Sequence, residues 1–441
     1  MRKRSFALQT LLLAGAAVLI AGQAQAKDVA PLKPAIDALL DKNYAHLDAL
    51  YKDIHAHPEL GFQETATAAK LAAGMKALGF TVTQGVGKTG VVAIYKNGPG
   101  PVVMVRTELD ALPMEEKSGL PYASHATQMW NGKPAPVAHS CGHDIHMASW
   151  VGTAQALLAM KDKWRGTLMF VAQPSEESTG GAIGMIEDGL FTKFPKPTYG
   201  FGLHVGPGPY GYVSYRPGVT TSNSDSMEIL FKGRGGHGSM PSLTIDSVVQ
   251  AAKFVVDVQT VISREKDPAA FGVVTVGAIQ AGSAGNIIPD SALIRGTIRS
   301  YEPGVRTKLL DGVRRTANAE AAMAGAPAPQ IELTPGGTAV VNDIALTDKT
   351  AKVFKAAFGD KAVLEAAPSP ASEDYSEFII AGVPSVFFSI GGYDPAKIAA
   401  AKAKGEFLPG NHTPYFAPVP EPTIRTGVAA MTLAVMNVMQ P

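Results

Sequence analysis

Short apolar runs alternate with helical patterns along most of the chain, and this alternation is the feature that most constrains the fold. Residues 91–95, 102–106 and 168–172 have the length and the β-branched or apolar composition of buried strands. Apolar residues at helical spacing precede and separate these runs, at residues 32–55 and 147–160. Strands that alternate with helices form a mainly parallel sheet covered by helices, so we predict an α/β fold.

The alternation is interrupted in the middle of the chain and resumes near its end. The interrupting block has the order strand, helix, strand, strand, helix, which is typical of a compact α+β sandwich. We therefore predict one α/β domain, split into residues 27–217 and 334–441, with an inserted domain at residues 218–333. A mature chain of about 415 residues is long enough for two hydrophobic cores. The predicted elements of the block are residues 227–232, 245–263, 272–279, 293–300 and 305–324.

The first 26 residues resemble a secretory signal. A basic start at residues 2–4 is followed by an apolar run at residues 8–22, which is too short to span a membrane comfortably. The small residues Ala24 and Ala26 then form a cleavage pattern before Lys27. We predict a protein that is secreted, into the periplasm if the host is Gram-negative, with no stable membrane anchor after cleavage. An uncleaved N-terminal anchor is the alternative.

Charge and cysteine content narrow the class of protein further. The formal net charge is +1, and the sequence has no basic stretch that would serve as a nucleic-acid footprint or a polybasic membrane patch. The single cysteine, Cys141, cannot form an internal disulfide. In an oxidising compartment such a thiol is buried and inert, bound to a metal, or reactive.

Histidines cluster around this cysteine in the segment HSCGHDIH. The spacing of Cys141 and His143 allows both side chains to face one ion, and His139 and His146 lie nearby. Zinc accepts thiolate, imidazole and carboxylate ligands. Any one of these histidines is equally well explained as a structural residue, so the prediction depends on more distant partners.

Candidate partners follow other predicted strands. Glu176 and Glu177 come directly after the strand at residues 168–172, and His204 ends another apolar run. Ligands in α/β proteins usually bind at the carboxyl ends of the strands, where these side chains are expected to meet. Two adjacent glutamates repel each other, and a nearby cation would offset that repulsion. The alternative is a pair of solvated loop acids. His412 lies in a late loop.

Two further acids, Glu108 and Asp110, follow the strand at residues 102–106. They can orient a ligating histidine from behind the metal, or they are ordinary loop acids. The glycine pattern at residues 233–238 matches a dinucleotide fingerprint. Residues 239–241, however, separate it from the next helix, so we exclude a nucleotide site and interpret His237 in this loop as a mobile polar group.

Taken together, a series of motifs in register gives the whole mature chain a family resemblance. It resembles bacterial N-acyl-amino-acid amidohydrolases, including hippurate hydrolases and plant auxin-conjugate amidohydrolases, within the dinuclear aminoacylase and carboxypeptidase metallopeptidases. The motifs are HPEL (57–60), DALP (110–113), CGHDIH (141–146), QPSEE (173–177), GLHV (202–205), GGHGSMP (235–241), NIIPD (286–290), GTIRS (296–300), SEDY (372–375) and NHTP (411–414).

The resemblance implies roles for individual residues. It implies a two-metal site, with zinc or manganese as the expected ions, whose ligands are Cys141, His143, Glu177, His204 and His412. It makes Glu176 the general base and Asp110 an acid behind the ligands. It also implies that the inserted domain acts as a lid, and that its His237 contacts the reacting carbonyl, in some relatives from the partner subunit of a homodimer. The oligomeric state itself cannot be read from the sequence.

Substrate class follows less directly. The resemblance implies a small-molecule amide or peptide, and Asn286 and Arg299 of the inserted domain are candidates to bind its carboxylate. An ion pair between Arg299 and a nearby acid is the alternative. The segment RTELDALP departs from the common RADMDALP, so Glu108 is one methylene longer than the usual aspartate. We expect an altered substrate preference. Two other classes stay open: a hydrolase with Cys141 as nucleophile, and a solute-binding protein without catalysis.

Overall fold

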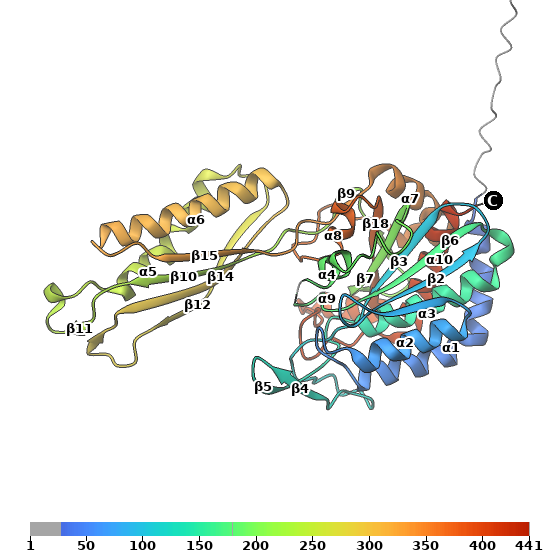
Figure 1. Ribbon diagram of the computed structural model, residues 1–441, viewed down its shortest axis with the longest axis horizontal. Helices are drawn as coiled ribbons and strands as arrows, with labels where there is room; N and C mark the ends of the chain where they lie inside the picture. Colours follow the sequence, from blue (N-terminus) through green and yellow to red (C-terminus); the bar gives the residue numbers. More distant parts are fainter. Residues whose placement is uncertain (1–27, 179, 441) are drawn as a thin grey trace, which may run out of the picture.

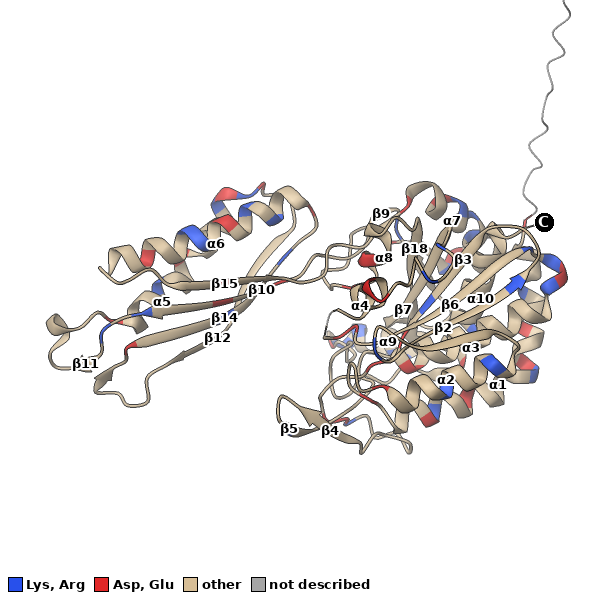
Figure 2. Ribbon diagram, viewed as in Figure 1, with Lys and Arg blue, Asp and Glu red and all other residues tan. Residues whose placement is uncertain are grey.

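The computed structural model describes residues 28–178 and 180–440, and they form two bodies joined by two crossing segments (Figure 1). The predicted signal segment, residues 1–26, lies outside the described residues. Within the described part of the chain, no helix is long and apolar enough to cross a membrane. On the outer helices α1 (Lys33–Ala56) and α6 (Pro303–Met323), basic and acidic residues are interspersed (Figure 2).

The larger body is built on one eight-stranded sheet, with strand order β1-β2-β6-β3-β7-β18-β8-β17. Its centre, β6-β3-β7-β18, is parallel, whereas β1 and β2 are antiparallel additions at one edge. This confirms the predicted mainly parallel α/β architecture. The strands are β1 (Thr81–Val86), β2 (Gly90–Asn97), β3 (Val102–Glu108), β6 (Gly166–Gln173), β7 (Tyr199–Pro209), β8 (Val213–Tyr215), β17 (Ala362–Leu364) and β18 (Ser385–Tyr393).

Helices cover both faces of this sheet, and each face has its own hydrophobic core. Helix α3 packs between α1 and α10 on one face, which explains why it is apolar on nearly all sides. The short helices α4 and α8 cover the other face with a smaller core. The helices of this body are α1, α2 (Thr65–Ala77), α3 (His143–Ala159), α4 (Gly181–Glu187), α7 (Ile344–Phe358), α8 (Ser376–Ile380), α9 (Pro395–Lys404) and α10 (Pro420–Val438).

The inserted domain is a four-stranded antiparallel sheet, of order β12-β14-β10-β15, with α5 and α6 packed on one face. The expected α+β sandwich is therefore present. Two details differ from the prediction. The helix predicted at residues 245–263 ends earlier and is followed by a π-helical turn at Val261–Glu265, and a last strand was not anticipated. The elements are β10 (Asp225–Lys232), α5 (Ser247–Asp257), β12 (Gly272–Ala281), β14 (Ser291–Ser300), α6 and β15 (Gln330–Pro335).

Short strand pairs complete the fold, and two chain segments cross between the bodies. The pairs are β4 (Thr127–Trp130) with β5 (Lys133–Pro136), β9 (Gly218–Val219) with β16 (Val341–Asn342), and β11 (Gly236–His237) with β13 (Ile287–Ile288). The crossing segments are hydrogen-bonded to each other, because Ser224 N donates to Gly337 O (2.9 Å) and Gly336 N donates to Ser224 O (2.7 Å).

Candidate active site

The predicted site residues of the α/β domain converge at the carboxyl edge of the parallel strands. Asp110 follows β3, Glu176 and Glu177 follow β6, and His204 lies within β7. These three strands are neighbours in the sheet, which is why residues far apart in sequence meet there. Helix α3 contributes His143 as its first residue.

A glycine permits the turn that presents Cys141 and His143 side by side. Gly142 has φ of 90°, a left-handed conformation, and a Cβ there would lie 2.4 Å from Val205 Cγ1. Only a residue without a side chain fits this position. The chain therefore turns sharply between the two donors and brings both to the same side.

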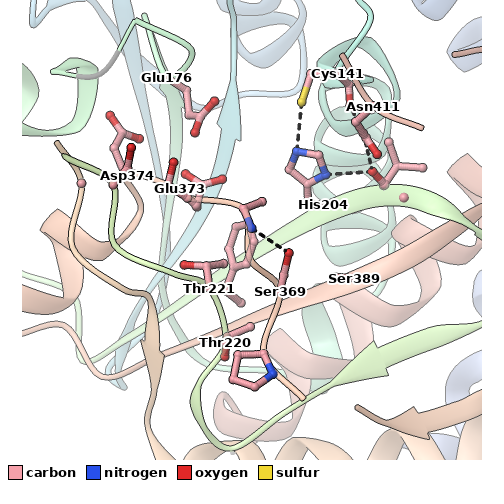
Figure 3. Close-up of a pocket in the computed structure, with 18 of the residues that line it drawn as sticks. Cys141, Glu176, His204, Thr220, Thr221, Ser369, Glu373, Asp374, Ser389 and Asn411 are labelled. Atoms are coloured by element: carbon pink, nitrogen blue, oxygen red, sulfur yellow. Dashed lines mark hydrogen bonds between the residues drawn. The ribbon is translucent and has the colours of Figure 1, made fainter. Parts of the chain in front are cut away.

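Thiol, imidazole and carboxylate groups form one compact cluster. Cys141 Sγ lies 3.2 Å from His204 Nε2 and 3.3 Å from His412 Nε2 (Figure 3 shows Cys141 and His204). His412 Nε2 lies 3.3 Å from Glu177 Oε1, and His143 Nε2 lies 3.9 Å from the same oxygen. Two donor triads, each within 4.8 Å, share the cysteine: Cys141 with His143 and His204, and Cys141 with Glu177 and His412.

Several buried polar atoms of this cluster have no hydrogen-bond partner among the described residues, and a bound metal ion would give them one. His143 Nε2, Glu177 Oε1 and Asp110 Oδ1 are buried and accept or donate no hydrogen bond among the described residues. A buried polar atom without a partner is costly. The donor set of thiolate, imidazole and carboxylate suits zinc and similar divalent ions. The two donor triads therefore fit divalent metal ions.

The pKa shifts of the cluster residues bear on whether Cys141 acts as a nucleophile. Burial alone would lower the pKa of His143, but Asp110, Glu108 and Glu177 outweigh it and raise that pKa to about 10. The same surroundings raise the pKa of Cys141 well above its usual value, through burial first and Glu177 next. The charged form of His143 is therefore stabilised, whereas burial lowers the pKa of His204 and a free thiolate at Cys141 is disfavoured. This weighs against Cys141 as an independent nucleophile.

Hydrogen bonds behind the cluster orient its ligands. The ring nitrogens Nδ1 of His143 and His204 each lie 2.8 Å from a backbone carbonyl, of Asp110 and Val205 respectively, so each Nε2 faces the cluster. Asp110 Oδ2 accepts a hydrogen bond from Glu177 N (2.9 Å). Asn411 Nδ2 donates to the carbonyls of Cys141 (2.8 Å) and Val205 (3.0 Å), which positions the loop of His412.

Glu176 lies at the edge of the cluster and faces the cleft. Its carboxylate is 3.9 Å from His143 Nε2, and its side chain is 11% exposed. Burial, followed by repulsion from Glu373 and Glu177, raises the pKa of Glu176 well above the usual value for glutamate. A raised pKa makes the Glu176 carboxylate a stronger base than an ordinary glutamate.

Sequence reasoning assigned no role to a charge network beneath the cluster. The buried Arg106 guanidinium pairs with Glu108, with Glu373 (2.7 Å) and with Asp374 (3.1 Å). Figure 3 shows Glu373 and Asp374 beside Glu176. The SEDY motif contained both acids, but nothing local linked them to Arg106. Glu108 also contacts His146 Nδ1 (2.9 Å), so both are buried partners beneath the donor cluster.

A cleft of about 1050 Å³ lies between the cluster and the inserted domain. Arg299 and Thr297 of β14 line it, together with Cys141, Glu176 and His204. Burial lowers the pKa of Arg299, and among the described residues no acid pairs with it. The alternative interpretation, in which Arg299 pairs with a nearby acid, therefore does not hold within this chain.

The structure does not bring His237 and Asn286 to this cleft. His237 is exposed in β11, at the end of the inserted domain that lies away from the α/β body (Figure 1). Its Nδ1 lies 2.8 Å from Ser239 Oγ. Asn286 is exposed beside it, and its carbonyl accepts from Gly238 N (2.8 Å). Within one chain, neither residue reaches the cluster.

His55, a buried histidine outside the cluster, makes the free energy of unfolding depend on pH. His55 Nδ1 lies 2.6 Å from Asp144, and its Nε2 lies 3.0 Å from Glu116. Burial alone would lower the pKa of His55, but these two carboxylates raise it from 6.5 to about 10. The folded protein thus holds a proton on His55 that the unfolded chain releases above about pH 6.5. The contribution of His55 to the free energy of unfolding is therefore fully present below that pH and is lost as the pH rises toward 10.

We expect the free energy of unfolding to fall by up to about 1.4 kcal/mol per pH unit over this window because of His55. All three tryptophans, Trp130, Trp150 and Trp164, lie in the α/β domain, so urea titrations followed by tryptophan fluorescence report on it alone. In His55→Gln, which cannot titrate, the curve should be flatter. Parallel curves for the two proteins would contradict the assignment.

Known proteins place this arrangement in a family. The model for "Peptidase family M20/M25/M40" matches residues 104–436. A hippurate hydrolase of Campylobacter jejuni is 37% identical over 330 residues, 74% of this chain and 82% of that protein. Thermostable carboxypeptidase 2 of Saccharolobus solfataricus is 33% identical over 387 residues, 87% of this chain and 92% of that protein.

A solved structure resembles this one over nearly its whole length. It is a Bacillus subtilis protein, described as a dinuclear metal-binding peptidase of the M20 family. The match has a TM-score of 0.72 at 27% identity and covers 90% of this chain and all of the other. Both the predicted family and the predicted fold are confirmed: the chain belongs to peptidase family M20/M25/M40, and it is a metal-dependent amidohydrolase or peptidase.

Proposed function

We propose that this protein hydrolyses the amide bond of N-acyl amino acids or small peptides, with Glu176 as the general base. The observation that carries the proposal is the position of Glu176, a carboxylate with a raised pKa that faces the cleft beside two donor triads sharing Cys141. The names of similar proteins, a hippurate hydrolase and a carboxypeptidase, favour an acyl amino acid or a peptide as the substrate.

The metal ligands in this proposal are Cys141, His143, Glu177, His204 and His412. Zinc or manganese fits the mixture of thiolate, imidazole and carboxylate donors. When bound, such ions polarise a carbonyl group and acidify water. The protein holds the donors in place through the carbonyls of Asp110 and Val205, so little reorganisation is needed at the moment of reaction.

Proton transfer falls to Glu176. It takes a proton from the attacking water and later delivers it to the amine that leaves, so one carboxylate acts first as base and then as acid. Its raised pKa suits both steps, because a group that is too acidic would not hold the proton between them.

Arg299 is the proposed contact for a substrate carboxylate. It lines the cleft from the inserted domain without an acidic partner. A half-buried guanidinium recognises a carboxylate through two parallel hydrogen bonds. Asn286 and His237 act in this proposal from the partner subunit of a homodimer, with His237 donating to the carbonyl oxygen, since neither reaches the cleft of its own chain.

Export to the periplasm is proposed from the basic start and the short apolar run of residues 2–26.

One experiment tests the reaction and the substrate class together. The protein from Lys27 onward is incubated with N-acyl amino acids, their methyl esters and dipeptides, with Zn²⁺ or Mn²⁺ in one arm and EDTA in the other. Mass spectrometry reads the free amino acids. We expect release that depends on metal and is strongest for substrates with a free carboxylate.

Matched variants of two arginines on β14 sharpen the substrate class. Arg299→Met should raise KM about 10- to 100-fold for the free acids but not for the methyl esters, because a charged hydrogen bond is lost. Arg295→Met is the control, since Arg295 pairs with Glu228 and does not line the cleft. Release that survives EDTA would instead favour Cys141 as nucleophile, and metal-loaded protein that releases nothing would contradict the proposed function.

A further inference from the structure

The HPEL motif begins a segment, residues 57–64, that lies against the loop carrying Glu176. Leu60 forms a parallel bridge with Ala111, and Glu59 O accepts a hydrogen bond from Ala111 N (2.8 Å). The segment thus contacts the chain directly after Asp110. Its last residue, Glu64, contacts the loop after β6.

Glu64 is fully buried, and both of its carboxylate oxygens have donors. Oε1 accepts from the backbone N–H of Ser175 (2.8 Å), and Oε2 accepts from the Thr89 hydroxyl (2.6 Å). Burying a carboxyl group is costly, and this burial raises the pKa of Glu64 to about 7. The group held at that cost binds the amide immediately before Glu176.

A second carboxylate holds the amide immediately after Glu176, since Asp110 Oδ2 accepts from Glu177 N (2.9 Å). The loop is therefore fixed by carboxylates at both neighbours of the proposed base. With the amides of Ser175 and Glu177 held beneath the cleft, the intervening side chain is directed into it.

The loop would not adopt this shape easily without such contacts. Ser175 has φ of 49°, a left-handed conformation that a residue with a Cβ rarely adopts. Its side chain is buried against Gly61, where an added Cβ would lie 2.6 Å from Ser175 Oγ. Unfavourable backbone conformations persist only where the surroundings enforce them. Gly61 and Glu64, three residues apart, supply these surroundings.

We infer that Glu64 is a positioning residue for catalysis: its carboxyl group holds the Ser175 amide and so fixes the direction of the Glu176 side chain. The inference rests on the proposed function, in which Glu176 is the base. It gives a role to the segment that begins with HPEL, which supplies no metal ligand and does not line the cleft.

Two substitutions separate the hydrogen bond from the charge and the volume of Glu64. Glu64→Gln keeps an oxygen that accepts from Ser175 N, and its amide can donate to Thr89. Glu64→Met has a similar length but no acceptor. We expect Glu64→Met to lower kcat by up to about 100-fold, because a misdirected base loses much of its effect. KM should stay near the wild-type value, as should the metal content measured by elemental analysis. Glu64→Gln should keep kcat near the wild-type value.

The matched control is Glu59→Met, in the same segment. The Glu59 carboxylate accepts from Thr67 N (2.7 Å) at the start of α2, and none of its hydrogen bonds among the described residues reaches the loop of Glu176. The Glu59→Met substitution should lower the melting temperature without lowering kcat. A loss of kcat in Glu64→Met would then reflect the position of Glu176 and not a general loss of stability.

Wild-type kcat in Glu64→Met would overturn the inference, as would loss of metal in that variant or failure of Glu64→Gln to restore kcat. Glu176→Ala distinguishes the two proposals. If it is inactive while Glu64→Met is fully active, the inference alone is wrong. If Glu176→Ala turns over normally, the proposed function is wrong and the inference falls with it.

Discussion

Glu176→Ala is expected to reduce kcat by about 10²- to 10⁴-fold while both metal ions stay bound, because the carboxylate that moves the proton is lost and no ligand is changed. The substitution removes a group from the edge of the cleft, and the donor triads that share Cys141 do not need it. Steady-state kinetics on the best substrate of the panel, together with elemental analysis of the purified variant, measures both quantities.

Glu177→Ala is the matched control, since it removes the neighbouring carboxylate that contacts His412 and faces His143. It should lose metal as well as activity, and added Zn²⁺ or Mn²⁺ should restore activity only in part. If Glu176→Ala loses metal and Glu177→Ala keeps it, the two roles are exchanged.

Most of the donor cluster could be predicted from the sequence because its members follow strands of one parallel sheet. Glu177 and His204 each follow or end an apolar run, and the carboxyl ends of neighbouring parallel strands must meet. Cys141 and His143 are two residues apart, so their proximity was local information. The motif NHTP supplied His412 only through the family resemblance, since nothing in its own loop indicates a ligand.

Contacts between distant segments could not be predicted where no strand-end pattern or motif linked the two residues. Arg106 and Glu373 are 267 positions apart, and the contact exists only because β3 and the segment before α8 meet beneath the cleft. Glu64 and Ser175 are likewise separated by 111 positions. The position of His237 relative to the cluster depends on how the two domains are arranged, and a motif such as GGHGSMP carries no information on that arrangement.

Local patterns also misled the prediction within the inserted domain. Apolar spacing continues past Asp257, but the chain leaves the α-helix there and forms the π-helical turn at Val261–Glu265. The strand β15 alternates partly buried and exposed residues at the edge of its sheet, and prolines flank it. A short edge strand of this kind gives a weak signal, because pairing with β10 rather than its own composition stabilises it.

The largest stability loss is expected from Arg106→Met. Arg106 is buried, and its guanidinium contacts Glu108, Glu373 and Asp374, while its Nε donates to Gln173 Oε1 (2.9 Å). Methionine fills a similar volume but leaves these carboxylates buried without a cation. Breaking a buried ion pair from one side costs about 3–5 kcal/mol. Urea titration followed by tryptophan fluorescence measures the loss in the α/β domain.

Arg425→Met is the surface control, because Arg425 pairs with Asp41 and Glu421 where both acids are largely exposed. It should cost less than about 1 kcal/mol. Equal losses in the two variants would contradict the buried network as a source of stability.

The pH dependence of the Arg106→Met loss identifies its cause. Burial raises the pKa of Asp374 to about 7 even with Arg106 beside it. An acid with a higher pKa in the folded state stays protonated there at a pH at which the unfolded chain has already ionised. Its unfavourable contribution to the free energy of unfolding therefore grows as the pH rises above about 4. Without Arg106, Asp374 stays protonated to a higher pH, and the loss should be small at pH 5 and larger at pH 8. A loss that is constant over this range would mean that packing around residue 106, and not the unpaired carboxylates, accounts for it.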